Sequence, residues 1–98
     1  MRIEYSEAAE LELNQAIDFY NNQVKGLGYE FAAEVQKSQR LIETHPNAWT
    51  PLSPVWRRCR TERFPYGLIY TGRNGNILIV AVMHLARNPT KWQEMKLE

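Results

Sequence analysis

The sequence has a single cysteine and no long apolar run. Cys59 has no second cysteine to pair with, which excludes an internal disulfide, and we expect its thiol to be buried in a strand. No apolar stretch approaches the roughly 20 residues that span a bilayer. Charged residues from Arg2 to Glu12 leave no apolar stretch for a signal peptide. We therefore expect a cytoplasmic protein without a membrane partner.

The common patterns of catalytic and metal sites are absent too. The sequence has no glycine-rich phosphate loop, no cysteine cluster, no pair of histidines at helical spacing and no nucleophile elbow. These absences predict a protein that binds neither a metal ion nor a cofactor. The two histidines are His45, at the end of a predicted helix, and His84, at the end of a predicted strand.

Length and composition indicate one folded domain over residues 1–98, with 44% hydrophobic and 23% charged residues. The charges are unevenly distributed. Residues 1–45 hold four basic and eight acidic residues, whereas residues 46–98 hold eight basic and three acidic ones. A basic second half raises the expectation of an anionic partner, either nucleic acid or an acidic protein segment.

The first half has the pattern of a short strand followed by two helices. Residues 2–5 alternate polar and apolar, and Ser6 is a favoured helix N-cap. Apolar residues then recur at helical spacing, with Glu10, Glu12 and Asp18 away from the apolar face, up to a predicted end near Val24. A second helix is predicted from about Gly28 to Thr44, and residues 47–54 read as an irregular connector.

The second half changes to the two-residue period of strands, which we predict at Val55–Thr61, Tyr66–Gly72 and Asn76–His84. Asn74 and Gly75 form a strong hairpin signal, and the continuous apolar run 77–82 predicts a central strand covered on both faces. Asn88 and Pro89 predict a short C-terminal helix. The expected fold is α+β, with a helical hairpin on one face of a mostly antiparallel sheet.

The densest basic stretch is Arg57, Arg58, Arg60 and Arg63. In a strand, Arg58 and Arg60 project from one face and Arg57 from the other. These arginines either pair with the acidic helices or form a row that binds an external anion, since guanidinium groups grip carboxylates and phosphates. His84 likewise has two interpretations: it is either a polar residue that ends a strand or a residue with a functional role.

Two stretches resemble the signatures of the RelE/ParE toxin superfamily. Residues 63–70 read Arg-Phe-Pro-Tyr-Gly-Leu-Ile-Tyr, and residues 82–92 contain the spaced His84, Arg87, Pro89 and Trp92 of that family's closing motif. The predicted helical hairpin is similar in the same order, so the resemblance covers nearly the whole chain. It implies a toxin of a type II toxin–antitoxin pair, neutralised by a cognate antitoxin in a hetero-oligomeric complex.

The resemblance also separates two kinds of target. RelE-like toxins cut messenger RNA on the ribosome without a metal ion, whereas ParE-like toxins poison DNA gyrase without demonstrated bond-making chemistry. Three RelE-type positions differ here: Gly67 replaces an arginine, residues 52–54 (Leu-Ser-Pro) replace a lysine pair, and Trp92 replaces a tyrosine. The resemblance therefore favours a ParE-like gyrase poison that is not an enzyme.

The charge split and the resemblance together predict one basic surface that binds the antitoxin or the target. Its predicted members are Arg57, Arg58, Arg60, Arg63, Arg73, His84, Arg87 and Trp92. The alternative function, a metal-independent endoribonuclease acting on the ribosome and mRNA, would use Arg60, Arg63, His84 and Arg87 for charge stabilisation and proton transfer. A second alternative is a decayed, non-toxic module that only binds an antitoxin.

Overall fold

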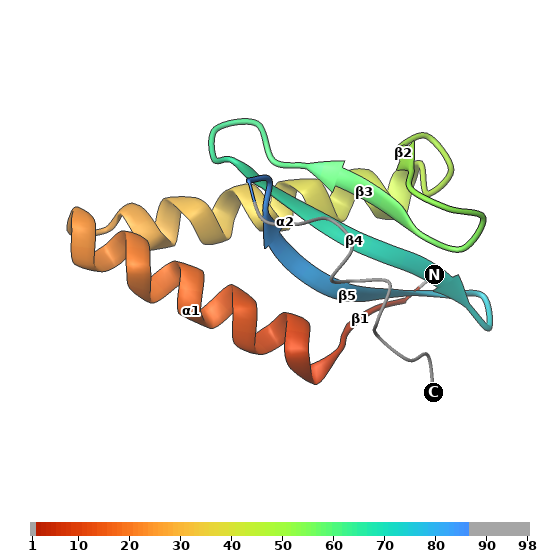
Figure 1. Ribbon diagram of the computed structural model, residues 1–98, viewed down its shortest axis with the longest axis horizontal. Helices are drawn as coiled ribbons and strands as arrows, with labels where there is room; N and C mark the ends of the chain where they lie inside the picture. Colours follow the sequence, from red (N-terminus) through yellow and green to blue (C-terminus); the bar gives the residue numbers. More distant parts are fainter. Residues whose placement is uncertain (1, 87–98) are drawn as a thin grey trace.

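The computed structural model describes residues 2–86, in which two helices lie along one face of a five-stranded sheet (Figure 1). The strand order is β1-β5-β4-β3-β2; β1 runs parallel to β5, and the other neighbours are antiparallel. This arrangement confirms the predicted α+β fold, whereas the predicted C-terminal helix lies outside the described residues. The elements are β1 (Ile3–Tyr5), α1 (Glu7–Gln23), α2 (Leu27–Thr44), β2 (Thr50–Pro51), β3 (Arg57–Arg60), β4 (Tyr66–Arg73) and β5 (Asn76–His84).

Both helices begin and end close to the predicted residues. The Ser6 side chain accepts a hydrogen bond from the Ala9 amide at 3.1 Å, which satisfies one of the unpaired N–H groups at the start of α1. Helix α1 ends at the C-cap Val24. Gly26, with a φ of 84°, then supplies the left-handed turn that reverses the chain into α2. No helix among residues 2–86 is long and apolar enough to cross a membrane.

The two helices meet closely at Gly28, in the first turn of α2. Its amide donates a hydrogen bond to Asn21 Oδ1 at 2.7 Å, which ties the start of α2 to the end of α1. A Cβ atom at this position would collide with the backbone carbonyl of Ile17 and lie 2.6 Å from the Asn21 Cγ. The hairpin therefore requires glycine at this position for steric reasons rather than for a special φ angle.

The sheet differs from the prediction at its β2–β3 side. Residues 47–54, expected to be irregular, contain the short strand β2, which pairs with Arg57 and Arg58. Strand β3 begins at Arg57 rather than Val55, because the Ser53 side chain accepts the amides of Val55 and Trp56, each at 3.1 Å. The loop before β3 thus closes on itself through a side-chain acceptor, a local competition that strand periodicity does not reveal.

Other strand predictions agree with the structure. Asn74 and Gly75 both adopt positive φ angles, 52° and 77°, as expected for a tight hairpin turn between β4 and β5. Strand β5 lies between β1 and β4 and is buried over residues 77–83 except at Leu78, which is partly buried. An extra residue in β5, opposite Ile69 and Tyr70, forms a bulge.

Apolar side chains fill both faces of this sheet. On the helix-covered face, Phe31, Val35 and Ile42 of α2 pack with Leu68 and Ile79. On the opposite face, which we call the far face, a second cluster contains Trp56, Ile69, Val80, Ala81 and Met83. Cys59 is fully buried in the helix-side cluster, as predicted.

We predict that Gly28→Ala destabilises the fold by about 1–3 kcal/mol, because the added methyl meets a backbone carbonyl that cannot rotate away. Urea unfolding followed by circular dichroism measures the loss. Gly72→Ala is the matched control, since a Cβ there would meet nothing closer than the Asn76 carbonyl oxygen at 4.0 Å. Equal stabilities of the two variants would show that the helix contact is not tight.

We also predict that alkali weakens the fold through Cys59 and Tyr70. Burial raises the pKa of the Cys59 thiol from 9.0 to about 11 and the pKa of the Tyr70 hydroxyl from 10.0 to about 12. The folded state prefers the protonated groups, so the stability that they contribute is present below about pH 9 and is lost as pH rises from there toward 12, by at most about 1.4 kcal/mol per pH unit and group. Tyr5, whose pKa burial also raises to about 12, adds to this loss above pH 10. Unfolding free energies measured between pH 7 and 11 test this, with a shallower fall in Cys59→Ala below pH 10; a flat profile would contradict it.

Candidate functional site: the arginines of the sheet

The sheet divides the clustered arginines between its two faces, as their spacing predicts. Arg60 is paired with Gly67, which is paired with Met83 of the far-face cluster. Arg58 is paired with Ile69 of the same cluster, so Arg58 and Arg60 both project from the far face. Neither forms an ion pair with a described residue. The far face therefore carries two adjacent guanidinium groups without counter-ions in the described part of the chain.

Arg58 lies across Gly67 of the neighbouring strand. A Cβ at Gly67 would be 2.9 Å from Arg58 Cγ and 3.0 Å from Cδ, so the absent side chain provides the space that the arginine stem fills. The Arg58 Nε atom is buried and has no hydrogen-bond partner. A buried, unpaired donor of this kind is costly, and a movement of the side chain that exposes Nε to an acceptor would remove that cost.

Arg57 points to the helix-covered face, where it is paired with the buried Tyr70. Its Nη1 atom donates to the Trp49 carbonyl oxygen at 2.8 Å. The alternative that Arg57 pairs with an acidic helix is thus not what the structure contains. Arg57 instead ties the loop after α2 to the sheet.

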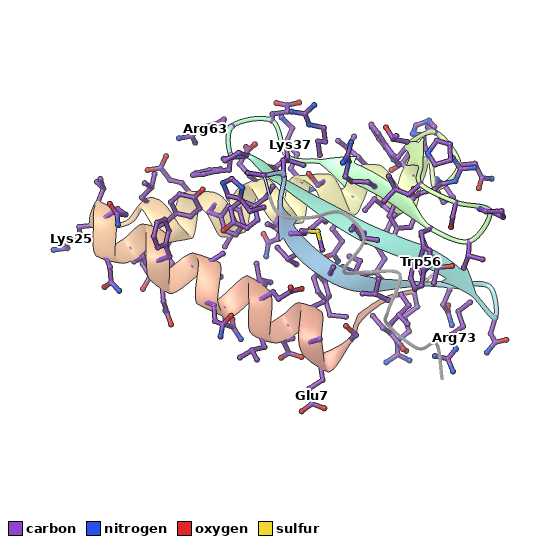
Figure 2. All side chains as sticks on the ribbon, in the orientation of Figure 1. Glu7, Lys25, Lys37, Trp56, Arg63 and Arg73 are labelled. Atoms are coloured by element: carbon purple, nitrogen blue, oxygen red, sulfur yellow. The ribbon has the colours of Figure 1, made fainter. Side chains whose placement is uncertain are left out.

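Arg63 lies in the loop between β3 and β4 (Figure 2) and is the arginine of the basic stretch that pairs with an acidic helix. Its Nη2 atom lies 2.8 Å from Glu30 Oε1 of α2, and its amide donates to Glu34 Oε1 at 3.3 Å. The guanidinium carbon also lies 5.3 Å from the centre of the Phe64 ring. Exposed ion pairs contribute little stability, so this contact mainly orients the loop.

His84 lies on the helix-covered face, away from Arg60. Its ring contacts Tyr66 edge-on, with 5.2 Å between ring centres, and a small open cavity of about 190 Å³ separates it from Phe19 of α1. Its Nδ1 atom accepts the Ala86 amide at 3.0 Å, so neutral His84 carries its proton on Nε2. His84 therefore offers a donor toward the α1 side of the sheet, not toward the far-face arginines.

The structure therefore separates the predicted site residues. Arg58 and Arg60 come together on the far face, whereas Arg57, Arg63 and His84 lie in three other surroundings. Arg73 stands at the β4–β5 turn, and Arg87 and Trp92 lie outside the described residues. Among residues 2–86, no group of three or more His, Cys, Asp or Glu side chains could hold a metal ion.

Sequence reasoning missed Glu12, which was placed away from the apolar face of α1. The Glu12 carboxylate accepts the Val82 amide of β5 at 3.1 Å and is half-buried. Helical periodicity gave no signal for this contact, because an acidic residue on a helix flank ordinarily faces water. Glu12 thus joins α1 to the strand that ends at His84.

A protein-family model described as "ParE toxin of type II toxin-antitoxin system, parDE" matches residues 3–89. The chain belongs to the ParE toxin family. A chain of a solved structure, "Chromosomal ParDE TA system from P. aeruginosa", superposes with a TM-score of 0.76 at 15% identity, over 87% of this chain and 96% of that one. At 15% identity, this structural similarity shows that the two chains share a fold. No curated protein sequence matches the chain.

Membership of the ParE family confirms the resemblance seen in the sequence, and this chain is a ParE-like toxin of a type II system. A toxin of such a system has an antitoxin partner. The structure adds a physical account of Gly67, the position where RelE-like toxins carry an arginine. In this toxin that space is filled from the neighbouring strand by Arg58.

We predict that Gly67→Ala moves Arg58 off β4. The added methyl meets a flexible side chain rather than backbone, so the loss of stability is about 1 kcal/mol, less than for Gly28→Ala. The displaced Nε–H becomes solvated, and its hydrogen exchange, followed by NMR, becomes faster than in the parent protein. An unchanged exchange rate would mean that Arg58 does not rest on Gly67.

Proposed function

We propose that this ParE-family toxin poisons DNA gyrase without making or breaking bonds itself, and that its cognate antitoxin neutralises it by covering the far-face arginines. The observation that carries the proposal is the pair Arg58 and Arg60, which project together from one sheet face without a described counter-ion. Guanidinium groups in that arrangement favour an anionic partner surface. The proposal requires the toxin to act in the cytoplasm, where gyrase works.

The scattered positions of the other groups support a binding role over catalysis. Cleavage of RNA by general acid and base needs its groups within hydrogen-bond reach of one substrate atom. Arg60 projects from the far face, His84 from the opposite face, and Arg63 is held by Glu30. The sheet thus lies between Arg60 and His84, two described members of the alternative ribonuclease set.

Purified toxin is expected to inhibit supercoiling by gyrase and to increase cleaved DNA, because a gyrase poison traps the enzyme on broken DNA. Arg58→Gln/Arg60→Gln is expected to raise the concentration for half inhibition, or for neutralisation by antitoxin, on the order of tenfold. Lys25→Gln/Arg40→Gln removes the same charge from the helical hairpin and serves as the matched control. Equal effects of the two double variants would show that net charge, not the far face, matters.

Two further outcomes would replace the proposal. Unaffected gyrase together with specific cuts in translated messages, mapped by primer extension after induction, would establish the ribonuclease function. Unaltered growth after induction of the chain alone, with the protein folded, would establish the non-toxic antitoxin-binding module. Inhibited gyrase with intact messages supports gyrase poisoning.

A further inference from the structure

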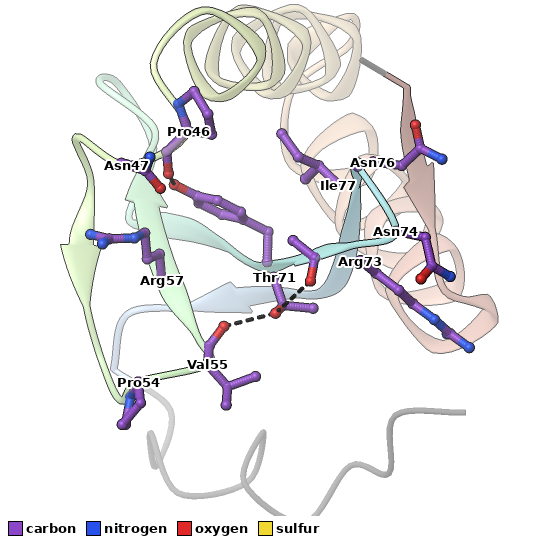
Figure 3. Close-up of a pocket in the computed structure, with 13 residues that line it drawn as sticks. Pro46, Asn47, Pro54, Val55, Arg57, Thr71, Arg73, Asn74, Asn76 and Ile77 are labelled. Carbon is purple, nitrogen blue, oxygen red and sulfur yellow. Dashed lines mark hydrogen bonds between the residues drawn. The ribbon is translucent and has the colours of Figure 1, made fainter.

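A notch opens in the sheet at the end of the molecule farthest from the helical hairpin turn (Figure 3). It has a volume of about 670 Å³, in the range of ligand-binding clefts. Its walls come from the residues after α2, the loop before β3, strand β4 and the β4–β5 turn. None of these features belongs to the far-face arginine pair.

The notch exists because β3 is shorter than β4. Pairing between the two strands stops at Arg57 and Tyr70, while β4 continues to Arg73. In this register Val55 would stand opposite Gly72 and form the next ladder hydrogen bonds. Instead, its amide donates to the Ser53 side chain at 3.1 Å and its carbonyl accepts the Thr71 hydroxyl at 2.8 Å (Figure 3). The loop backbone is therefore used internally and cannot complete the ladder.

Beyond Tyr70, β4 has no part of β3 opposite it, and Gly72 lies in the middle of this stretch. The Tyr66 carbonyl points toward β3, where it accepts the Thr61 amide at 2.9 Å. Backbone groups of every second residue point the same way along a strand, so the N–H and C=O of Gly72 also point into the notch. The Thr71 hydroxyl lies 3.4 Å from the Gly72 carbonyl oxygen, but its single proton has the shorter bond to Val55. An exposed donor and acceptor side by side form a template for one more strand.

The charge of the notch indicates what that strand should carry. Arg57 and Arg73 stand on opposite sides of it in Figure 3, and no Asp or Glu occurs among the described residues that line it. Arg57 has one nitrogen committed to Trp49, which leaves other donors of its guanidinium available. Arg73 has no ion pair among the described residues. The notch is therefore complementary to carboxylates.

We propose that this notch binds an extended, acidic peptide segment of a protein partner, which pairs its backbone with Gly72 and places carboxylates on Arg57 and Arg73. The backbone edge favours a peptide over a nucleic acid, because a sugar–phosphate chain offers no matching N–H and C=O pair. The assignment of this segment to the antitoxin rests on the proposed function. The ability of the notch to bind an acidic peptide does not depend on that function.

Two variants at Gly72 separate backbone pairing from simple space filling. Gly72→Pro removes the N–H that points into the notch but no hydrogen bond of the β4–β5 ladder, because that ladder uses the alternate residues. Gly72→Ala keeps the N–H, and its methyl has room. Arg73→Gln tests the charge, and Lys25→Gln, at the opposite end of the molecule in Figure 2, is its charge-matched control.

The test is an NMR titration of the ¹⁵N-labelled full chain with the peptide acetyl-Val-Glu-Glu-Val-Val-amide, whose adjacent carboxylates project to opposite faces of a strand, as Arg57 and Arg73 do. We expect the largest changes in amide chemical shift around Gly72 and Arg73. The dissociation constant should rise about fivefold or more in Gly72→Pro and Arg73→Gln and stay unchanged in Gly72→Ala and Lys25→Gln. Equal binding of a lysine-for-glutamate peptide, or unchanged binding by Gly72→Pro, would overturn the proposal. Shifts reproduced by inorganic phosphate alone, or by a DNA oligonucleotide, would also overturn it in favour of a plain anion site.

The spectra of all variants first establish that each is folded. The same Gly72→Pro protein is then assayed on gyrase without any partner, where inhibition equal to that of the parent toxin is expected. Loss of peptide binding with intact gyrase inhibition would confirm that the notch recognises a partner and not the target. A parent toxin that binds the peptide but leaves gyrase unaffected would remove the proposed function and keep the notch.

Discussion

The arrangement of the whole domain depends on how β5 satisfies its backbone on the side away from β4. Strand β1 pairs with only Ile77, Leu78 and Ile79, although β5 continues to His84. Helix α1 replaces the missing strand: Ser6 bonds to the Ile79 carbonyl through its amide at 2.8 Å and to the Val80 carbonyl through its hydroxyl at 3.3 Å, and Glu12 accepts the Val82 amide at 3.1 Å. These polar contacts fix where α1 crosses the sheet, and the close contact at Gly28 then fixes α2. Unpaired backbone groups in a buried strand are costly, so these hydrogen bonds add a directional constraint on α1 that apolar packing alone lacks.

Much of this fold could be predicted because its signals are local. Ser6, Gly26 and the Asn74–Gly75 pair each determine a cap or turn by their own conformational preferences, and the apolar run of β5 indicates an interior strand. The errors have a different origin. The late start of β3 and the half-buried position of Glu12 depend on side chains that bind backbone groups of other residues. Strand β2 is a pairing of only two residues, too short for periodicity to indicate. Periodicity reports which face a residue occupies, but it does not report which backbone groups a side chain satisfies.

The same limit of periodicity explains why the basic residues were predicted to form one surface, whereas the structure distributes them over several places. Strand alternation alone separates Arg57 from Arg58 and Arg60, and that much was evident in the sequence. The capture of Arg63 by Glu30 and the placement of His84 against Tyr66 depend on how the helices lie over the sheet, which charge counting does not reveal. A net positive charge in one half of a chain can therefore correspond to several separate basic sites in the folded protein, each with its own neighbours.

Two glycines of β4 show how one residue type produces two different surfaces along the β3–β4 seam. Gly67 lacks a side chain on the far face, and Arg58 fills the space from the next strand. Gly72 lies beyond the end of β3, where an added Cβ would find open space and where the backbone has no strand opposite it. The first glycine lets an arginine lie flat on the sheet, and the second leaves main-chain groups accessible from outside. Because the loop at Ser53 ends β3 before it reaches Gly72, the same hydrogen bonds that shorten this strand also create the open edge.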